Sequence, residues 1–293
     1  MKIAILLTGQ PRNLEQGAHW FKNHVFPKDC GLDVDYFCYF WDDGDPDLRS
    51  RIENTYNPIR YHIQSFEKTI DNFIDQVQNK NWQLANWNFV PEKYQQSHLF
   101  RTDKQYISNY SKNIWGQFFC SHKITKMVGN LDHYDIVIRT RSDVAFKNME
   151  IEYWKQAFNN MYKNPIFNDK VFAPWLYVDS GIPLFADFAF ISKPNVWYKF
   201  NSNIEEYCFN LATEHKQLWY ELEVSEFYHH PHWIWNKMAM YSKTNMLSFS
   251  VVWPMPFDCK LIRYPEKLKD LSWKHIAQQH EKYETENPYK PND

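Results

Sequence analysis

Polar residues that would suit an anion follow the first apolar segment of the chain. Directly after residues 2–7 come Thr8, Gly9, Gln10 and Arg12. Backbone amides in such a turn, together with a guanidinium group, would hold a phosphate or the edge of a nucleobase. Neither GxxxxGKS/T nor GxGxxG occurs there, so the turn is not a phosphate-binding loop of either type. The simpler alternative is an ordinary turn with a solvated arginine at the start of a helix.

An acidic segment follows the second apolar run, at residues 34–40. It begins with Asp42 and Asp43 and continues to Asp47. Carboxylates at this point would reach a ligand bound at the end of a strand. Capping of the helix that follows is the simpler explanation, because aspartate is a common residue at helix starts.

Arg141 and Asp143 directly follow residues 134–140, the most convincing apolar strand after the first. A carboxylate there would ligate a hard divalent cation, which prefers oxygen ligands and pairs well with phosphates. The alternative is a structural ion pair between Asp143 and either Arg139 or Arg141. The pattern favours a functional role for Asp143 over this ion pair.

Three further residues have side chains suited to proton transfer or ligand binding. Asp187 interrupts the apolar residues 184–191, where a carboxylate buried without a partner would cost several kcal/mol. It therefore implies a paired cation, a bound ligand or a position facing a cleft. Glu226 and His232 belong to a cluster with histidines at 229 and 230. Zinc would need a closed tetrahedral set that this spacing does not supply, so a polar helix start is the simpler interpretation.

The elements that must position these residues alternate between strands and helices. Apolar runs predict strands, and apolar residues at helical spacing predict helices. Strands are expected at 2–8, 34–40, 59–63, 134–140, 171–173 and 188–191, and helices at 14–26, 66–77, 107–128, 151–161, 194–211 and 231–241. Asn13 and Gln16 fit a capping box before the first helix. The alternation indicates an α/β fold with a mainly parallel sheet, whose ligands bind outside the carboxyl ends of the strands.

Composition narrows the classes of function. The chain has 293 residues and a formal charge of -2, whereas a protein that wraps nucleic acid would carry a basic excess. Aromatic residues make up 18% of the chain and supply a large core. The five cysteines are widely spaced, which favours reduced, buried thiols. No apolar run reaches the roughly 18 residues that a membrane-spanning helix needs. We expect no transmembrane segment, no nucleic-acid partner and a cytoplasmic location, free or peripheral to a membrane.

Five segments in this order resemble one known group of proteins. They read MKIAILLTGQPRNLE, VDYFCYFWDD, YDIVIRTRSDV, FADFAFISKPNVW and HPHWIWNKMAMY. Over about residues 1–241 the chain is similar to GT-A-type glycosyltransferase-like proteins of polysaccharide and capsule synthesis in bacteria and large viruses. The resemblance implies one GT-A-like domain over 1–293, with helices on both sides of a mainly parallel sheet in a three-layer αβα arrangement. A nucleotide-binding half would span about 1–145 and an acceptor half about 146–260, followed by a tail at 261–293 that wraps the surface.

The resemblance also implies a reaction. Such proteins move a sugar from a nucleotide-sugar donor to a hydroxyl of a saccharide or glycan acceptor. The nucleotide would lie against the turn of residues 8–12, Asp42 and Arg141. A divalent cation, Mn²⁺ or Mg²⁺, would bind Asp143, which stands in the place of the family's Asp-x-Asp motif. The chain departs from that motif at Arg141, which would itself neutralise diphosphate charge.

Candidates for the catalytic base come from the same resemblance. Asp187 matches the aspartate of the family's later strand, where acceptor contacts and the base are found. His232 stands where related sequences often have glutamate after a proline. Glu226 or His232 would then serve as the base instead of Asp187.

Two other classes of function compete with a transferase. A non-catalytic carbohydrate- or nucleotide-binding protein on the same fold is favoured by the missing carboxylate at position 141, because fold does not fix function. A single-strand nucleic-acid binder with stacking aromatic residues is opposed by the charge of -2.

Overall fold

The computed structural model describes most of the chain. The described residues are 1–69, 104–147, 150–174, 176–179, 182–185, 187–201, 235, 238–252, 259–263, 268 and 271–286. Within them, no helix is long and apolar enough to cross a membrane. The four cysteines in these ranges are free and buried, as expected: Cys30, Cys38, Cys120 and Cys259.

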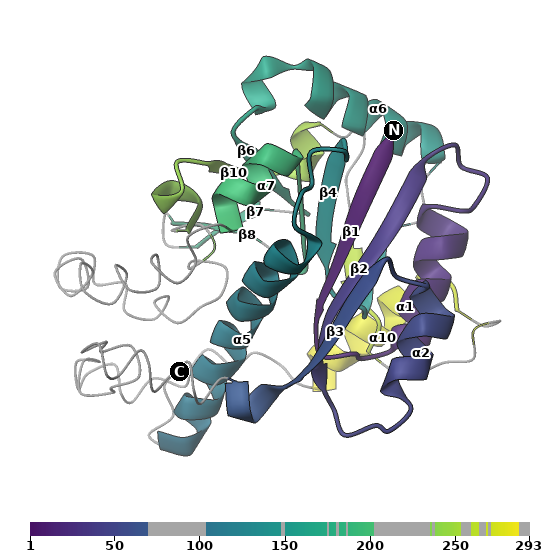
Figure 1. The fold of residues 1–293 in the computed structure, drawn as a ribbon, viewed down its shortest axis with the longest axis vertical. Helices are drawn as coiled ribbons and strands as arrows, with labels where there is room; N and C mark the ends of the chain where they lie inside the picture. The colour runs from purple at the N-terminus through teal and green to yellow at the C-terminus, as the bar shows by residue number, and fades with distance from the viewer. Residues whose placement is uncertain are drawn as a thin grey trace, which may run out of the picture.

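A seven-stranded sheet forms the centre of the molecule (Figure 1). Its strands, from one edge to the other, are β10 (Asn245–Ser248), β6 (Lys170–Ala173), β9 (Ala189–Ser192), β4 (Ile136–Thr140), β1 (Lys2–Gly9), β2 (Asp33–Asp42) and β3 (Arg60–Ser65). In this sheet β9 alone runs opposite to its neighbours, since every other pairing is parallel. The mainly parallel α/β fold predicted from the sequence is therefore confirmed.

Helices cover both faces of the sheet. The described helices that do so are α1 (Leu14–Trp20), α2 (Leu48–Tyr56), α5 (Lys104–Val128), α6 (Ile151–Lys163), α7 (Pro194–Asn201) and α10 (Trp273–Glu286). Figure 1 shows α5 and α7 on one side of the sheet and α1, α2 and α10 on the other. The buried side chains of α6 belong to the same core as those of α1 and α2. This is the expected three-layer arrangement.

The alternation of side chains along β1 explains the two cores. Ala4 and Leu6 point to the face covered by α5 and α7, whereas Ile3, Ile5 and Leu7 point to the opposite face. Successive residues of a strand face opposite sides, so a strand buried on both faces is apolar throughout. The run of apolar residues that predicted this strand is thus a requirement of the central position of β1 in the sheet.

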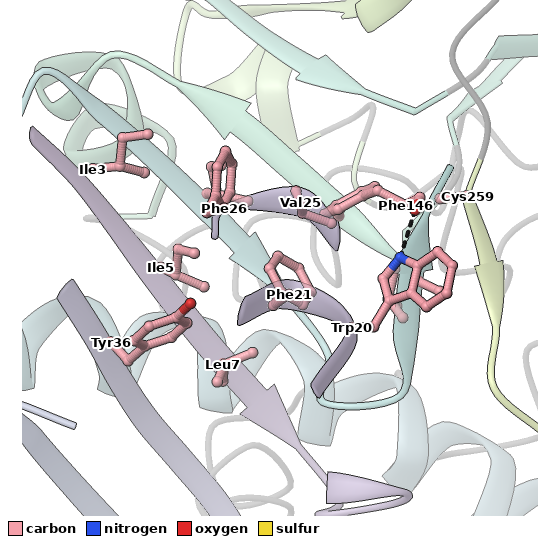
Figure 2. Packing of buried hydrophobic residues seen from close by; sticks show 14 of the residues in the cluster. Ile3, Ile5, Leu7, Trp20, Phe21, Val25, Phe26, Tyr36, Phe146 and Cys259 are labelled. Carbon is pink, nitrogen blue, oxygen red and sulfur yellow. Dashed lines mark hydrogen bonds between the residues drawn. The ribbon is translucent and has the colours of Figure 1, made fainter. Parts of the chain in front are cut away.

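The core beneath α1 is rich in aromatic side chains (Figure 2). Phe21 lies in a short π-helix, Phe21–Val25, that continues α1, and its ring meets Phe146 edge to face with centroids 5.4 Å apart. The buried indole N–H of Trp20 donates a hydrogen bond of 2.6 Å to the carbonyl oxygen of Phe146. This bond satisfies a polar group that would otherwise be costly to bury.

Asn13 precedes α1 but does not form the expected capping box. Its backbone is left-handed, with φ 46°, and its side chain makes no hydrogen bond to the first turn. Instead the Asn13 amide donates to the carbonyl oxygen of Ile262, 2.5 Å away. The prediction of the helix start was right and that of its cap was wrong, because a residue distant in sequence competes for the side chain.

Two small antiparallel pairs were not expected from the sequence. Strand β5 (Val144–Phe146) pairs with β11 (Cys259–Leu261), and β7 (Leu176–Asp179) pairs with β8 (Ile182–Phe185). The part of residues 261–293 that the structure describes also packs into the core instead of only covering the surface. Its buried apolar residues are Leu261, Ile262, Leu271 and Ile276.

Candidate active site

A pocket of about 220 Å³ opens at the carboxyl ends of the parallel strands. Because β1 pairs with β2 on one side and with β4 on the other, the residues that follow these strands meet at one edge of the sheet. The described residues that line the pocket are Thr8, Gly9, Gln10, Arg12, Trp41, Phe66, Gln117, Arg139 and Arg141. Three of them are arginines, so the wall of the pocket is cationic.

Arg139 is the most buried of the three arginines, at 1% exposure. Its Nε donates to the Thr8 hydroxyl at 2.9 Å and its Nη1 donates to the Asp187 carbonyl oxygen at 2.8 Å. Burial lowers the pKa of Arg139 to about 10, and the negative charge of Asp187 opposes that shift. The guanidinium group therefore remains protonated at neutral pH and is fixed at the base of the pocket.

The ring faces of Phe190 and Trp235 lie near the same guanidinium group. The distances from the Arg139 guanidinium carbon to the two ring centroids are 5.7 Å and 5.5 Å. A cation over an aromatic face is stabilised by the ring quadrupole, most of all where water is excluded. These rings partly replace the solvation that Arg139 loses on burial.

Arg141 forms a two-point ion pair with Asp143. Its Nε and Nη2 donate to Oδ1 and Oδ2 of Asp143 at 2.9 and 2.7 Å. The side chain of Arg141 is 22% exposed, whereas that of Asp143 is 4% exposed. Burial opposes the charged form of Arg141, but Asp143 and then Asp187 favour it, and the pKa of Arg141 is raised overall. The carboxylate is thus more buried than the arginine and is not among the residues that line the pocket.

Arg12 differs from the other two arginines because it is exposed and unpaired. Its side chain has no hydrogen bond or ion pair with any residue that the structure describes. It nevertheless lines the pocket. An exposed guanidinium group of this kind is able to close on a bound anion with two parallel hydrogen bonds.

Aromatic side chains form the opposite wall. The rings of Trp41, the penultimate residue of β2, and Phe66, which directly follows β3, meet edge to face with centroids 5.0 Å apart. Phe119 stacks on Trp41 from α5, with centroids 5.8 Å apart. A Cβ atom at Gly116 would lie 2.8 Å from the Phe66 ring, so glycine allows the rings to approach the helix.

The loops around the pocket are joined by hydrogen bonds to backbone carbonyl oxygens. Gly9 ends β1 with φ 105°, a conformation that other residues rarely adopt. The Ser142 hydroxyl donates to the carbonyl oxygen of Arg12 at 2.9 Å and lies 3.3 Å from that of Gln10. The backbone N–H of Ile262 donates to the Asp143 carbonyl oxygen at 2.7 Å. The segment 141–143 is therefore held from two sides.

The structure brings together most of the residues singled out from the sequence. Lining the pocket are Thr8, Gly9, Gln10, Arg12 and Arg141. Asp187 is buried at the same edge, just before β9, where its charge acts on Arg139 and Arg141. The antiparallel direction of β9 explains this position, because the residue that enters β9 lies beside the end of β4.

The other four candidates are not among the described residues that line the pocket. Asp143 is at the same edge but does not line the pocket, and both of its carboxylate oxygens accept hydrogen bonds from Arg141. Asp42 is exposed, and its Oδ1 accepts a hydrogen bond of 2.9 Å from the backbone N–H of Gly44, as in a turn. Glu226 and His232 lie outside the described residues.

The described donors do not fit a divalent cation. No carboxylate is among the pocket-lining residues that the structure describes. The described part of the chain as a whole contains no group of three or more His, Cys, Asp or Glu residues that could hold a metal ion. Both oxygens of Asp143 already accept hydrogen bonds from Arg141. Hard cations prefer several oxygen ligands, which this side of the pocket does not offer.

The sequence did not single out three of the lining residues. Trp41 and Phe66 lie at the carboxyl ends of β2 and β3, so the rule that identified Asp42 would also have found them. Gln117 lies on α5, and its buried Oε1 has no hydrogen-bond partner among the residues that the structure describes. Nothing in the sequence marks it, because its position depends on how α5 packs across the sheet.

Solved structures that are similar to this chain include the following two. The chain is similar to mouse xyloside xylosyltransferase 1 in its apo form, with a TM-score of 0.44 and 11% identity over 85% of each chain. It is also similar to core-mannan synthase A from Aspergillus fumigatus in a Mn/GDP form, with a TM-score of 0.43 and 14% identity over 89% of this chain and 75% of that one. No protein-family model and no curated protein matches the chain. At these identities the likeness concerns the fold alone.

Proposed function

We propose that the protein is a glycosyltransferase that moves a sugar from a nucleotide-sugar to a hydroxyl of a saccharide acceptor. The observation that carries the proposal is one pocket that joins three guanidinium groups to an aromatic wall at the carboxyl edge of the sheet. A nucleoside diphosphate has the matching parts, an anionic diphosphate and a flat base. The resemblance of five ordered sequence segments to capsule- and polysaccharide-forming transferases supports the same conclusion.

The two walls of the pocket suggest how a donor binds. Arg12 and Arg141 would contact the diphosphate, and Arg139 would supply further positive charge from beneath. Trp41 and Phe66 would lie against the base, since aromatic rings stack on nucleobases with about 1–3 kcal/mol per base. The backbone at Gly9 would allow the ligand to approach β1 closely.

This arrangement suits the chemistry of sugar transfer. The bond between the sugar and the diphosphate breaks through an oxocarbenium-like transition state, as in glycoside hydrolysis. Negative charge then develops on the leaving diphosphate, and fixed guanidinium groups stabilise it more in the transition state than in the ground state. A general base must take the proton of the acceptor hydroxyl if configuration is inverted. Asp187, Glu226 and His232 are our candidates for that base.

One observation favours a second candidate, a non-catalytic nucleotide- or carbohydrate-binding protein. Both carboxylates that the structure describes beside the pocket act on arginines: Asp143 pairs with Arg141, and Asp187 stabilises the charge of Arg139. Neither lines the pocket. A binding protein would need no more than the arginines and the aromatic wall.

Incubation with a panel of UDP- and GDP-sugars separates the two candidates. Transferases hydrolyse their donors slowly when water replaces the acceptor, so we expect the release of free nucleoside diphosphate from one donor, measured by anion-exchange chromatography. Arg12→Ala should remove this release, whereas Arg49→Ala, which changes an exposed arginine on α2, should retain it. Tight binding of a nucleotide-sugar with no hydrolysis and no transfer to any oligosaccharide would establish the binding protein instead.

A further inference from the structure

We infer that the pocket binds a diphosphate through its arginines without a divalent cation, and that Asp143 serves to position Arg141. The nature of the ligand rests on the proposed function. The independence from metal rests on the geometry around Asp143, which differs from what the sequence resemblance implies.

The two oxygens of Asp143 are committed to one partner. Each accepts a hydrogen bond from Arg141, at 2.9 and 2.7 Å, and the residue is 3% exposed. A cation that bound Asp143 would have to compete with the guanidinium group for the carboxylate or displace it from a side-by-side arrangement. That group would then lose its counter-charge in a site where burial already opposes its charged form.

The charges around the pocket also disfavour a second cation. Arg12, Arg139 and Arg141 line it, while the described carboxylates that act on them are those of Asp143 and Asp187. One positive charge is therefore left over on this side of the pocket, where a divalent cation would be repelled and an anion attracted. Arg12 supplies that unpaired charge, because it has no partner among the described residues.

The arginines differ in how firmly they are fixed. Arg139 is held by Thr8 and by the backbone of residue 187, and Arg141 is held by Asp143. Two fixed guanidinium groups are thus already in place before a ligand arrives, so little conformational entropy is lost in ordering them when it binds. A metal ion ordinarily supplies charge of this kind to a diphosphate. Here the fixed arginines supply it.

Isothermal titration calorimetry with UDP, GDP and inorganic pyrophosphate tests the inference on the full chain. Each ligand is titrated first in excess EDTA and then with Mn²⁺ or Mg²⁺ in excess over the ligand. We expect the Kd of the ligand that binds to change less than twofold between these conditions. Tightening by tenfold or more with either cation would overturn the inference and leave the proposed function standing.

Two variants separate a positioning role of Asp143 from metal binding. Asp143→Asn keeps the shape of the side chain but weakens its hold on Arg141, so diphosphate affinity should fall about tenfold and equally with and without Mn²⁺. If that variant fails to fold, Arg141→Lys keeps the charge and removes the two-point pair, with the same expected loss. A loss of affinity seen only with Mn²⁺ present would identify Asp143 as a metal ligand.

The pyrophosphate arm keeps the two proposals distinguishable. Binding of pyrophosphate in EDTA without binding of either nucleotide would retain the arginine site and reject the nucleotide-sugar donor. If neither pyrophosphate nor a nucleotide binds with or without metal, both proposals are wrong.

Discussion

Gly17 lies so close to Ser142 that a Cβ atom on it would be 1.7 Å from the Ser142 carbonyl oxygen. The contact joins α1 to the segment that carries Arg141 and Asp143. The atom it would strike is backbone, which has little room to move. Gly17→Ala should therefore lower the free energy of unfolding by about 2 to 3 kcal/mol, although alanine is the better helix former.

Urea denaturation measures this effect, with Gly44→Ala as the control. Unlike Gly17, Gly44 lies where L side chains are strained, at φ 81°, but a Cβ atom there would meet nothing within 4 Å. The free energy of unfolding of the control should fall only by the roughly 1–2 kcal/mol that backbone strain costs. An equal loss of unfolding free energy in the two variants would mean that α1 and residue 142 are farther apart than the structure shows.

Arg12 offers a test of binding that leaves the fold intact. Its side chain is exposed and has no partner among the described residues, so Arg12→Ala should leave the melting temperature unchanged. A hydrogen bond to a charged group contributes about 1.5–3 kcal/mol, so diphosphate affinity should fall roughly tenfold or more. Calorimetry beside Arg49→Ala checks both statements. An unchanged Kd would place the ligand elsewhere.

Asp187 combines a structural role with the proposed catalytic one. Asp187→Asn removes the charge that opposes the effect of burial on Arg139, so we expect the free energy of unfolding to fall by about 3 kcal/mol. Asp187→Glu keeps the charge but moves the carboxylate. If Asp187 is the base, this second variant should retain a stable fold and lose most of kcat. Full kcat in Asp187→Glu would direct the search for the base to Glu226 or His232.

The salt bridges of Arg51 predict a pH dependence of stability. Arg51 donates to Glu15 at 2.6 Å and pairs with Asp45, and these contacts lower the pKa of both carboxyl groups. A carboxyl group with a lowered pKa in the folded state stabilises the fold above its ordinary pKa, here 4.5 for Glu15, and loses that contribution as pH falls through the folded value.

Arg51→Met provides the comparison. The stability difference between wild type and this variant should be largest at neutral pH and should shrink as pH falls below about 4. Both proteins are unfolded with urea at a series of pH values. A difference that stays constant over the series would show that Arg51 acts through packing and not through charge.

The strands could be predicted from the sequence because the sheet is buried on both faces. Residues 3–7 are apolar without interruption since β1 lies between β2 and β4, beneath helices on either side. Strand β5 and its partner β11 were missed because each has only three residues and their pairing joins segments more than a hundred residues apart. Such a pairing leaves no local pattern.

The site was predictable to the extent that it follows strand ends. The turn at Gly9 and the arginine at 141 could be placed at one edge because parallel strands end together. The two-point ion pair of Asp143 could not be placed, because the side-chain conformation of Arg141 depends on packing. Gln117 and the aromatic contacts of Trp41 depend on the path of α5 across the sheet, which no local sequence feature specifies.

The hydrogen bonds of Ile262 have a consequence for the order of events when the chain is made. Its N–H donates a hydrogen bond to the carbonyl oxygen of residue 143, and its own carbonyl oxygen accepts one from the Asn13 side chain. Residue 262, which is made late, therefore lies between two segments that are made much earlier. The first strands can pair while translation continues, but the segment that presents Arg141 lacks its final support until residue 262 has left the ribosome. The nascent protein would acquire affinity for its ligand only after residue 262 has been made.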